Sequence, residues 1–272
     1  PLALRVQTNQ RQRILLPETL AQKFQPETDY YWRLVASNKH GQTSSAPPAR
    51  RFRVDPQLPP LTEQDLAEFG ERSDGVMIEA SLDNAPQPQY GQLVEATGWK
   101  PAEGPQEDAR AVELDGQTGM LVYKLKAFPP RNYTVSFWFS PTKNEARLGQ
   151  AFSAWCRGMD DPLRLSVQNG KLYARMEAGK PISDQGTPVE AGSWYHVWAV
   201  KNGTTLTTYL NGKQVSELQV PMDVTSASRD FALGGNPHYI GSSEHLACQV
   251  ARLLVSARSF TSEEVQRLYE LK

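Results

Sequence analysis

The sequence predicts an all-β fold, a β-sandwich or jelly roll, over most of its 272 residues. Short strand-like segments recur at regular spacing, and several are separated by Asn-Gly pairs, which are typical of hairpin turns. From Tyr133 to Ser140, apolar side chains alternate with mostly polar ones, as in a strand that buries one face. The length of the chain allows one large β domain or two smaller ones.

Residues 1–55 are expected to form the strands of a smaller first module, with its clearest strand at residues 31–36. The pattern Phe-x-Pro-x-Thr-x-Tyr at residues 24–30 is that of a tyrosine corner, in which the Tyr30 hydroxyl bonds to upstream backbone. With this pattern, the segment resembles a fibronectin type III domain. The resemblance covers only the later strands of such a domain, which implies a truncated module with an open sheet edge.

Residues 56–74 are predicted to be a stiff linker that carries a short helix, because they combine three prolines with a Thr-x-x-Asp helix cap. The same segment contains Glu-x-Asp-x-x-Glu at residues 63–68, the carboxylate pattern of laminarinase-type glycoside hydrolases. That chemistry needs carboxylates that point from one strand into a cleft. On a helix the side chains would fan around the axis, so we interpret the pattern as non-catalytic.

The chain returns to short strands at Gly75, and a long polar loop is expected before the strand that begins near residue 111. The Asn-Gly pairs predict three hairpins, at residues 169–170, 202–203 and 211–212. After the last strand, Thr261 and Glu264 have the spacing of a capping box. They predict a short amphipathic helix that packs on the sandwich and ends the domain.

The order of these elements resembles the laminin-G-like, concanavalin-like jelly roll. The resemblance covers about residues 75–272, and such domains often carry acidic residues in the last strand, where this chain has Val-Ala-Arg-Leu at residues 250–253. It implies a fold that mostly binds ligands rather than catalysing reactions. The matching segments are residues 75–83, 114–116, 135–141, 194–198, 209–212 and 240–241, followed by the closing helix.

Charge and hydropathy exclude some partners. The 29 Lys and Arg residues nearly balance the 30 Asp and Glu residues, for a formal charge of −1. Nucleic acid and anionic membranes are therefore not expected as partners, since both need concentrated positive charge. No apolar run approaches membrane-spanning length, so we expect no membrane insertion. Cys156 and Cys248 could form one bridge, but we favour two buried free thiols.

The candidate ligand-binding residues are aromatic side chains in or near expected loops. Exposed aromatic rings can stack on the apolar C–H faces of sugar rings, and half-buried packing is the alternative for each of them. The candidates are Trp99, Trp155, Tyr90 and Tyr239. The tryptophans interpreted as core are Trp32, Trp138, Trp194 and Trp198.

Calcium is the candidate cofactor, because some laminin-G-like domains bind it near the rim through aspartates and backbone carbonyls. Asp160 and Asp161 resemble one such position, and Asp83 and Asp115 are further candidates for the rim. Calcium takes about six or more oxygen ligands, so two adjacent carboxylates would be only part of a site. The alternative is that these aspartates make turns.

The resemblance implies a non-catalytic binding module of a larger secreted or cell-surface protein, with a glycan or an extracellular protein as its partner. No catalytic residues are predicted. The chain begins at Pro1 without Met, so we expect a processed product or a fragment. Two alternatives stay open: a structural spacer or cell-adhesion segment without its own ligand, and an accessory region of a polysaccharide-degrading enzyme. Exposed Trp or Tyr on a concave face would favour glycan binding.

Overall fold

The computed structural model describes residues 24–25, 28–32, 35–38, 41–44, 50–53, 75–144, 146–239 and 244–271. The chain divides into two compact units, Pro1–Gln64 and Asp65–Lys272. This division falls within the segment predicted as a linker. The predicted linker helix and its Glu-x-Asp-x-x-Glu pattern lie outside the described residues.

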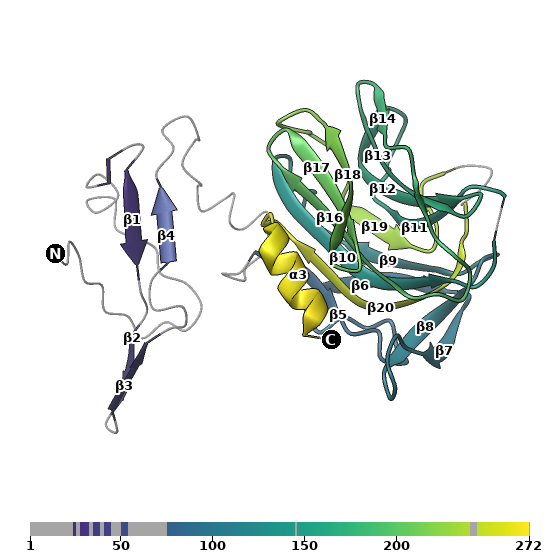
Figure 1. The fold of residues 1–272 in the computed structure, drawn as a ribbon. Coiled ribbons are helices and arrows are strands. Elements are labelled where there is room, and N and C mark those ends of the chain that lie inside the picture. Colours follow the sequence, from purple (N-terminus) through teal and green to yellow (C-terminus); the bar gives the residue numbers. More distant parts are fainter. Residues whose placement is uncertain are drawn as a thin grey trace. The chain divides into compact units, whose positions relative to one another are not determined.

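In the first unit, the described strands form two antiparallel pairs (Figure 1). The strands are β1 (Asp29–Trp32) with β4 (Arg50–Arg53), and β2 (Val35–Asn38) with β3 (Gly41–Ser44). The predicted tyrosine-corner contact is confirmed, since the backbone N–H of Gln25 donates to the Tyr30 hydroxyl at 2.7 Å. The Phe24 ring packs edge-on against Tyr30, with ring centroids 4.9 Å apart. The assignment to a fibronectin type III domain stays a prediction.

The second unit contains two antiparallel eight-stranded sheets (Figure 1). Sheet 1 has the order β18-β17-β16-β10-β20-β8-β7, and β5 also pairs with β20. Its strands are β5 (Val76–Ala80), β7 (Trp99–Glu103), β8 (Arg110–Asp115), β10 (Asn132–Pro141), β16 (Tyr195–Asn202), β17 (Thr205–Leu210), β18 (Lys213–Gln219) and β20 (Ala247–Ser256).

Sheet 2 has the order β14-β13-β12-β11-β19-β9-β6, and β15 also pairs with β13. The two sheets together form a sandwich, which confirms the predicted all-β fold class. The strands of sheet 2 are β6 (Gln92–Thr97), β9 (Met120–Lys124), β11 (Gly149–Ser153), β12 (Asp160–Gln168), β13 (Lys171–Ala178), β14 (Pro181–Ser183), β15 (Thr187–Pro188) and β19 (Asp230–Leu233).

The hydrophobic core lies between the two sheets. The alternation predicted for β10 places Phe137 and Phe139 in this core, fully buried. Phe137 of sheet 1 stacks on Phe152 of sheet 2 at 6.4 Å, and Phe152 stacks on Phe231 at 4.8 Å. These rings bury large apolar areas and hold the two sheets together.

Two of the three predicted hairpin turns have both central residues in the left-handed region. The φ angles are 51° and 67° for Asn169 and Gly170, and 51° and 77° for Asn211 and Gly212. A type I′ turn requires this conformation, and it explains why Asn-Gly pairs predicted the hairpins. The third turn joins β16 to β17 and begins at Gly203, with φ 56°.

The closing helix, α3 (Ser262–Glu270), lies on the outer side of sheet 1 (Figure 1). The capping box is confirmed: the Glu264 N–H donates to the Thr261 hydroxyl at 3.2 Å, and the Thr261 N–H donates to the Glu264 carboxylate at 2.9 Å. The apolar face of the helix buries Val265 against Trp198 and Val200 of β16. The helix therefore shields aromatic side chains that point away from the main core.

The expectation of a long polar loop before residue 111 is wrong. This segment forms β6 and β7, which lie at one edge of sheet 2 and one edge of sheet 1. Their exposed and partly buried side chains lack a strong apolar pattern, because an edge strand buries little surface. Pro101 lies within β7, which an edge strand tolerates.

Candidate functional site

Polar side chains form two neighbouring rows on the outer face of sheet 2. The residues in each row are direct partners on adjacent strands, and the residues between them, such as Leu165 and Ala174, face the core. We call them the polar rows: Gln150, Ser166 and Tyr173 in one row, and Ser153, Arg164, Arg175 and Ser183 in the other. They form on β11, β12, β13 and β14 because side chains alternate between the two faces of a strand.

The two arginines of the polar rows differ in their partners. Arg164 Nη2 donates to Glu177 Oε1 at 2.6 Å, and Arg164 Nε donates to Asp161 Oδ2. Asp161 is fully buried, and burial raises its pKa to about 7 although the neighbouring guanidinium acts to lower it. Arg164 is therefore committed to a buried ion-pair network within the protein.

Arg175 has no such network. Its guanidinium lies over the Tyr173 ring at 5.0 Å, and within the described part of the chain it makes no hydrogen bond or ion pair. Burial, together with the nearby Arg164 charge, lowers the pKa of Arg175. Ser166 Oγ and Gln150 Oε1 are also buried without a hydrogen-bond partner among the described residues. The polar rows thus contain both satisfied and unsatisfied groups.

Two of the predicted ligand-binding aromatics meet beside these rows. Trp155 follows β11 and Tyr239 follows β19, and their rings pack edge to face with centroids 5.7 Å apart. Tyr239 is 45% exposed. Trp155 is partly buried, and its backbone N–H donates to the Ser153 hydroxyl at 3.4 Å. We call Trp155 and Tyr239 the aromatic pair.

Comparison with known families assigns this sandwich to a superfamily. Residues 114–266, more than half of the chain, match the laminin G family model described as the concanavalin A-like lectin/glucanases superfamily. The chain belongs to this superfamily. No curated protein matches the sequence significantly.

Solved structures share this concanavalin A-like fold at low sequence identity. The binding domain of Paraclostridial Mosquitocidal Protein 1 has a TM-score of 0.57 and 16% identity, and the match covers 72% of this chain and 52% of that one. The botulinum neurotoxin serotype D binding domain has a TM-score of 0.58 and 13% identity, with 73% and 52% covered. A third match, with a TM-score of 0.55, 10% identity and 73% and 52% covered, is the binding domain of botulinum neurotoxin DC in complex with rat synaptotagmin II. The chain spans about half the length of these structures, and the likeness shows the fold alone.

The other two predicted ligand-binding aromatics lie elsewhere in this concanavalin A-like domain. Trp99 begins β7 and is partly buried against the main core, so the expectation that it lies in a loop is wrong. Tyr90 forms an isolated β-bridge with Glu79, through backbone bonds in both directions. Neither residue belongs to the aromatic pair.

Asp115, a predicted calcium ligand, holds the turn between β8 and β9. Its carboxylate accepts from the N–H groups of Gln117, Thr118 and Gly119 at 2.7 Å, and from the Thr118 hydroxyl at 2.9 Å. Burial acts to raise the pKa of Asp115, but these hydrogen bonds lower it to about 2. This is the turn-forming geometry of the alternative interpretation.

The other predicted metal ligands are dispersed. Asp160 Oδ2 accepts from the Ala227 N–H at 3.0 Å and from Arg157 at 3.3 Å, while Asp161 is paired with an arginine as described above. Asp83 lies exposed after β5. No three His, Cys, Asp or Glu side chains of the described ranges are placed to hold one metal ion. These donors do not fit a shared calcium site, and calcium binding stays a prediction.

A buried lysine binds backbone carbonyl oxygens at one end of the sandwich. The sequence did not indicate this residue. Lys201 Nζ donates to the carbonyl oxygens of Arg131, Gly203 and Met222 at 3.0, 2.6 and 2.7 Å. Burial lowers the pKa of Lys201 to about 8, while the Asp223 carboxylate acts to raise it. The lysine thus ties three separate loops together through their backbone.

The two cysteines are free thiols. Cys248 is fully buried and Cys156 only partly, and burial raises the pKa of Cys248 to about 12. Within the described residues, no helix is long and apolar enough to cross a membrane.

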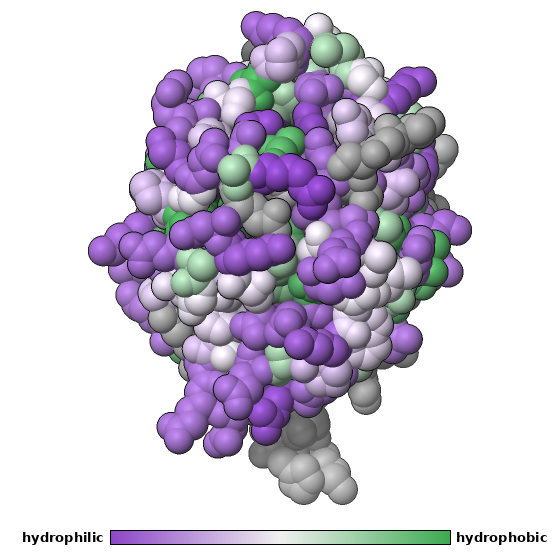
Figure 2. Space-filling view, turned by 90° about the vertical axis from the view of Figure 1, so that its right-hand side faces the viewer, coloured by the Kyte–Doolittle hydropathy of each residue, from purple (hydrophilic) through white to green (hydrophobic). Residues whose placement is uncertain are grey.

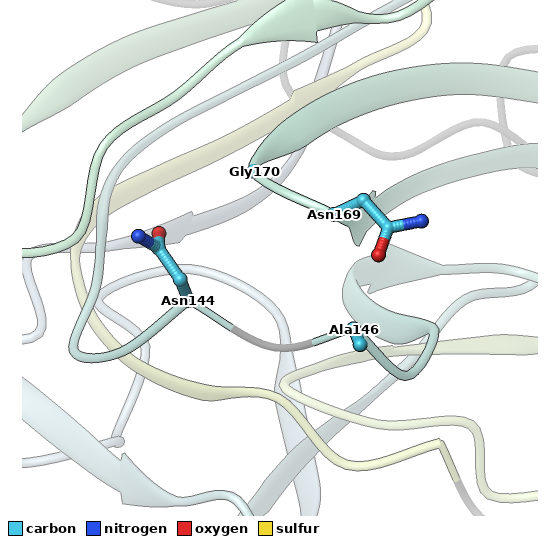
Figure 3. A pocket seen from close by; sticks show the side chains of 4 residues that line it. All are labelled: Asn144, Ala146, Asn169 and Gly170. Carbon is cyan, nitrogen blue, oxygen red and sulfur yellow. The ribbon is translucent and has the colours of Figure 1, made fainter.

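A shallow depression of about 400 Å³ opens to solvent between the segment after β10 and the β12–β13 turn. Asn144 and Ala146 line one side of it, and Asn169 and Gly170 line the other. The two asparagine carboxamides do not point toward each other (Figure 3). None of the aromatic or acidic residues predicted from the sequence lines this depression.

Proposed function

We propose that this chain is a non-catalytic recognition module of an extracellular or cell-surface protein, and that it binds a glycan or a protein. The observation that carries the proposal is the aromatic pair, whose two rings come from distant parts of the sequence and meet outside the core. Tyr239 is exposed and Trp155 is partly buried, and such aromatic rings offer apolar surface with little side-chain entropy to lose on binding.

The surroundings of the aromatic pair support recognition through polar contacts. Within the adjoining rows, Tyr173, Arg175 and Ser183 are at least partly exposed and present hydroxyl and guanidinium groups that can orient a polar ligand. Figure 2 shows one side of the molecule, on which hydrophilic side chains dominate and hydrophobic ones form only small, separate spots. This side therefore lacks the broad apolar patch that a large obligate interface would need.

The comparisons add support of a general kind. The superfamily is named for lectins and glucanases, and several solved structures with this fold are named as binding domains. For a further structure with this fold, cell entry of botulinum neurotoxin type C is described as dependent upon interaction with two ganglioside molecules, and one binding domain is in complex with rat synaptotagmin II. These are properties of those proteins, and they make glycan and protein ligands the first to test here.

The test is a binding screen of the full chain against immobilised polysaccharides, glycans and extracellular matrix proteins, with calcium or with a chelator. We expect saturable binding that weakens when Trp155→Ala or Tyr239→Ala is introduced. Tyr31→Ala is the matched control, since Tyr31 is 68% exposed on the first unit. Absence of saturable binding to every probe would contradict the proposal and favour a spacer. A calcium role predicts that the chelator lowers the melting temperature.

A further inference from the structure

We infer that Asn169 is a site of spontaneous deamidation, at which the backbone nitrogen of Gly170 displaces the side-chain amide. The chain contains three Asn-Gly pairs, at residues 169–170, 202–203 and 211–212, and all three lie in hairpin turns. Glycine favours this reaction because it has no Cβ and lets its nitrogen approach the preceding side chain. The three pairs are alike in sequence, so only their surroundings distinguish them.

The reaction is an intramolecular displacement that needs only water. Hydroxide removes the Gly170 N–H proton, and the nitrogen attacks Cγ of Asn169. The new C–N bond closes a succinimide ring while the bond from Cγ to the side-chain nitrogen breaks, and ammonia leaves. Water then adds to either ring carbonyl and opens the ring, which leaves aspartate or isoaspartate at position 169. The carboxamide and the attacking nitrogen must both be free to rotate toward each other.

Asn169 meets these requirements. It is exposed in the β12–β13 turn and lines the depression described above (Figure 3). Among the described residues, neither its carboxamide nor the Gly170 N–H has a hydrogen-bond partner. The Gly170 carbonyl accepts from the Val189 N–H at 2.9 Å, but this bond does not involve the attacking nitrogen. A Cβ built on Gly170 would have its nearest contact at 3.6 Å, so this turn has room to change conformation.

The Asn202 pair is held at its attacking nitrogen. The Gly203 N–H donates to Asn132 Oδ1 at 3.0 Å, and Lys201 Nζ donates to the Gly203 carbonyl at 2.6 Å. Lys201 is fully buried, so its contact fixes the turn to the sandwich. Asn202 itself is exposed, but the Gly203 nitrogen must break its bond to Asn132 before it can turn toward Cγ.

The Asn211 pair is held at its carboxamide. Asn211 Oδ1 accepts from the His196 N–H at 2.8 Å, and the Asn211 N–H donates to the His196 carbonyl at 2.9 Å. A Cβ built on Gly212 would lie 3.0 Å from the Tyr269 ring of α3, so the helix leaves this turn little room. Folding therefore restrains the pairs at 202–203 and 211–212 and leaves the pair at 169–170 reactive.

The two products have different effects on the β12–β13 hairpin. Each replaces a neutral carboxamide at the depression with a carboxylate. Asp-Gly is favoured in type I′ turns as Asn-Gly is, so the aspartate product should keep the hairpin. Isoaspartate adds a carbon atom to the backbone between the two strands and should disturb their pairing.

The experiment incubates the full chain at pH 8 in water labelled with heavy oxygen, folded and in denaturant, and follows each asparagine by peptide mass spectrometry. The label separates conversion during incubation from conversion during digestion. Cleavage after Lys and Arg places Asn169 in residues 165–171, while Asn202 and Asn211 share residues 202–213 and are separated by fragmentation. We expect similar rates in denaturant. In the folded chain, Asn169 should convert about tenfold faster than the other two, because these must first open locally.

Asn132→Ala tests the reason for the protection of Asn202. It removes the acceptor of the Gly203 N–H, so Asn202 should convert faster, while the rate at Asn169 should stay unchanged as the internal control. Asn169→Asp carries the charge of the product and should keep the melting temperature of the wild type. Conversion of Asn169 that is no faster than at the other two sites, or that folding abolishes, would overturn the inference. An unchanged Asn202 rate in Asn132→Ala would also overturn it.

Discussion

The outer faces of the two sheets differ in the side chains that they carry and in what covers them. On sheet 1, aromatic side chains that point away from the main core are covered by the chain's own helix α3, and Trp138 stacks on His196 at 4.6 Å beside Tyr269 of that helix. On sheet 2, the outer face carries polar side chains, of which Arg164 is satisfied and Arg175 is not. We infer that sheet 1 uses its outer face for stability and sheet 2 for recognition.

The difference between the two faces shows how one fold can separate stability from recognition. A buried aromatic cluster contributes to the free energy of folding through the apolar area that it removes from water. A recognition surface must keep groups available, and this costs stability. Substitutions on the two faces should therefore have opposite profiles, with large stability effects on sheet 1 and large binding effects on sheet 2.

The largest stability effect is expected for Trp138→Ala on sheet 1. The side chain is only 5% exposed, and its removal leaves a cavity under α3 that should cost about 3–5 kcal/mol in the free energy of unfolding. Denaturant titration measures this loss. Trp155→Ala on sheet 2 is the control and should cost much less. An equal loss for both variants would mean that the two faces do not differ.

The next effect is expected for Arg164→Met, the structural arginine of sheet 2. It leaves the buried Asp161 carboxylate without its partner and should cost about 3 kcal/mol in the free energy of unfolding at neutral pH. The pKa of Asp161 is raised to about 7 against an ordinary 3.8, so the folded protein binds more protons than the unfolded chain between these values. Stability from this group is therefore present below about pH 4 and lost as the pH rises towards 7.

In the variant this pH dependence should grow, because Asp161 then takes up a proton more readily. Unfolding measured at pH 5 and pH 8 checks it, and the loss should be larger at pH 8. The double variant Arg164→Met with Asp161→Leu should recover much of the stability. A loss that is the same at both pH values would argue against an uncompensated carboxylate.

A smaller effect is expected at the β8–β9 turn, which connects sheet 1 to sheet 2. Asp115→Ala removes the acceptor for three backbone N–H groups and should cost about 1–2 kcal/mol of the free energy of unfolding. Because the pKa of Asp115 is lowered to about 2, the stability that it confers is present above pH 4 and lost as the pH falls towards 2. The wild-type chain should lose more stability over this range than the variant.

The smallest stability effect is expected for Arg175→Gln. This guanidinium has no partner to lose within the described structure, so the free energy of unfolding should change by about 0.5 kcal/mol or less. Parallel denaturant titrations of Arg164→Met and Arg175→Gln compare two arginines that are direct partners in one sheet. Similar losses of unfolding free energy for both variants would contradict the distinction between a structurally paired and an unpaired arginine.

The features that could be predicted from the sequence are local ones. The β10 alternation, the Asn-Gly turns and the capping box each depend on residues close in the chain, and the tyrosine corner spans only residues 24–30. The edge strands β6 and β7 were missed because little of their surface is buried.

Features that depend on distant pairing could not be predicted in the same way. Trp138 and Trp198 are buried as expected, but in separate clusters beneath α3 and not between the two sheets, and only the position of the helix decides this. The sequence indicated Trp155 and Tyr239 separately, whereas the pairing of β11 with β19 brings them together. The difference between Arg164 and Arg175 depends on cross-strand neighbours, which no sequence spacing reveals.

The most direct test of the comparison is a nuclear magnetic resonance titration that follows the indole N–H signals of the six tryptophans. The full chain is titrated with neutral oligosaccharides, and single Trp→Phe variants assign Trp155, Trp138 and Trp198. We predict a saturable shift of the Trp155 signal, with the Trp138 and Trp198 signals unchanged beneath α3. Saturable shifts of Trp138 and Trp198 with a fixed Trp155 signal would contradict the account, because the ligand would then bind at the face that we assign to stability.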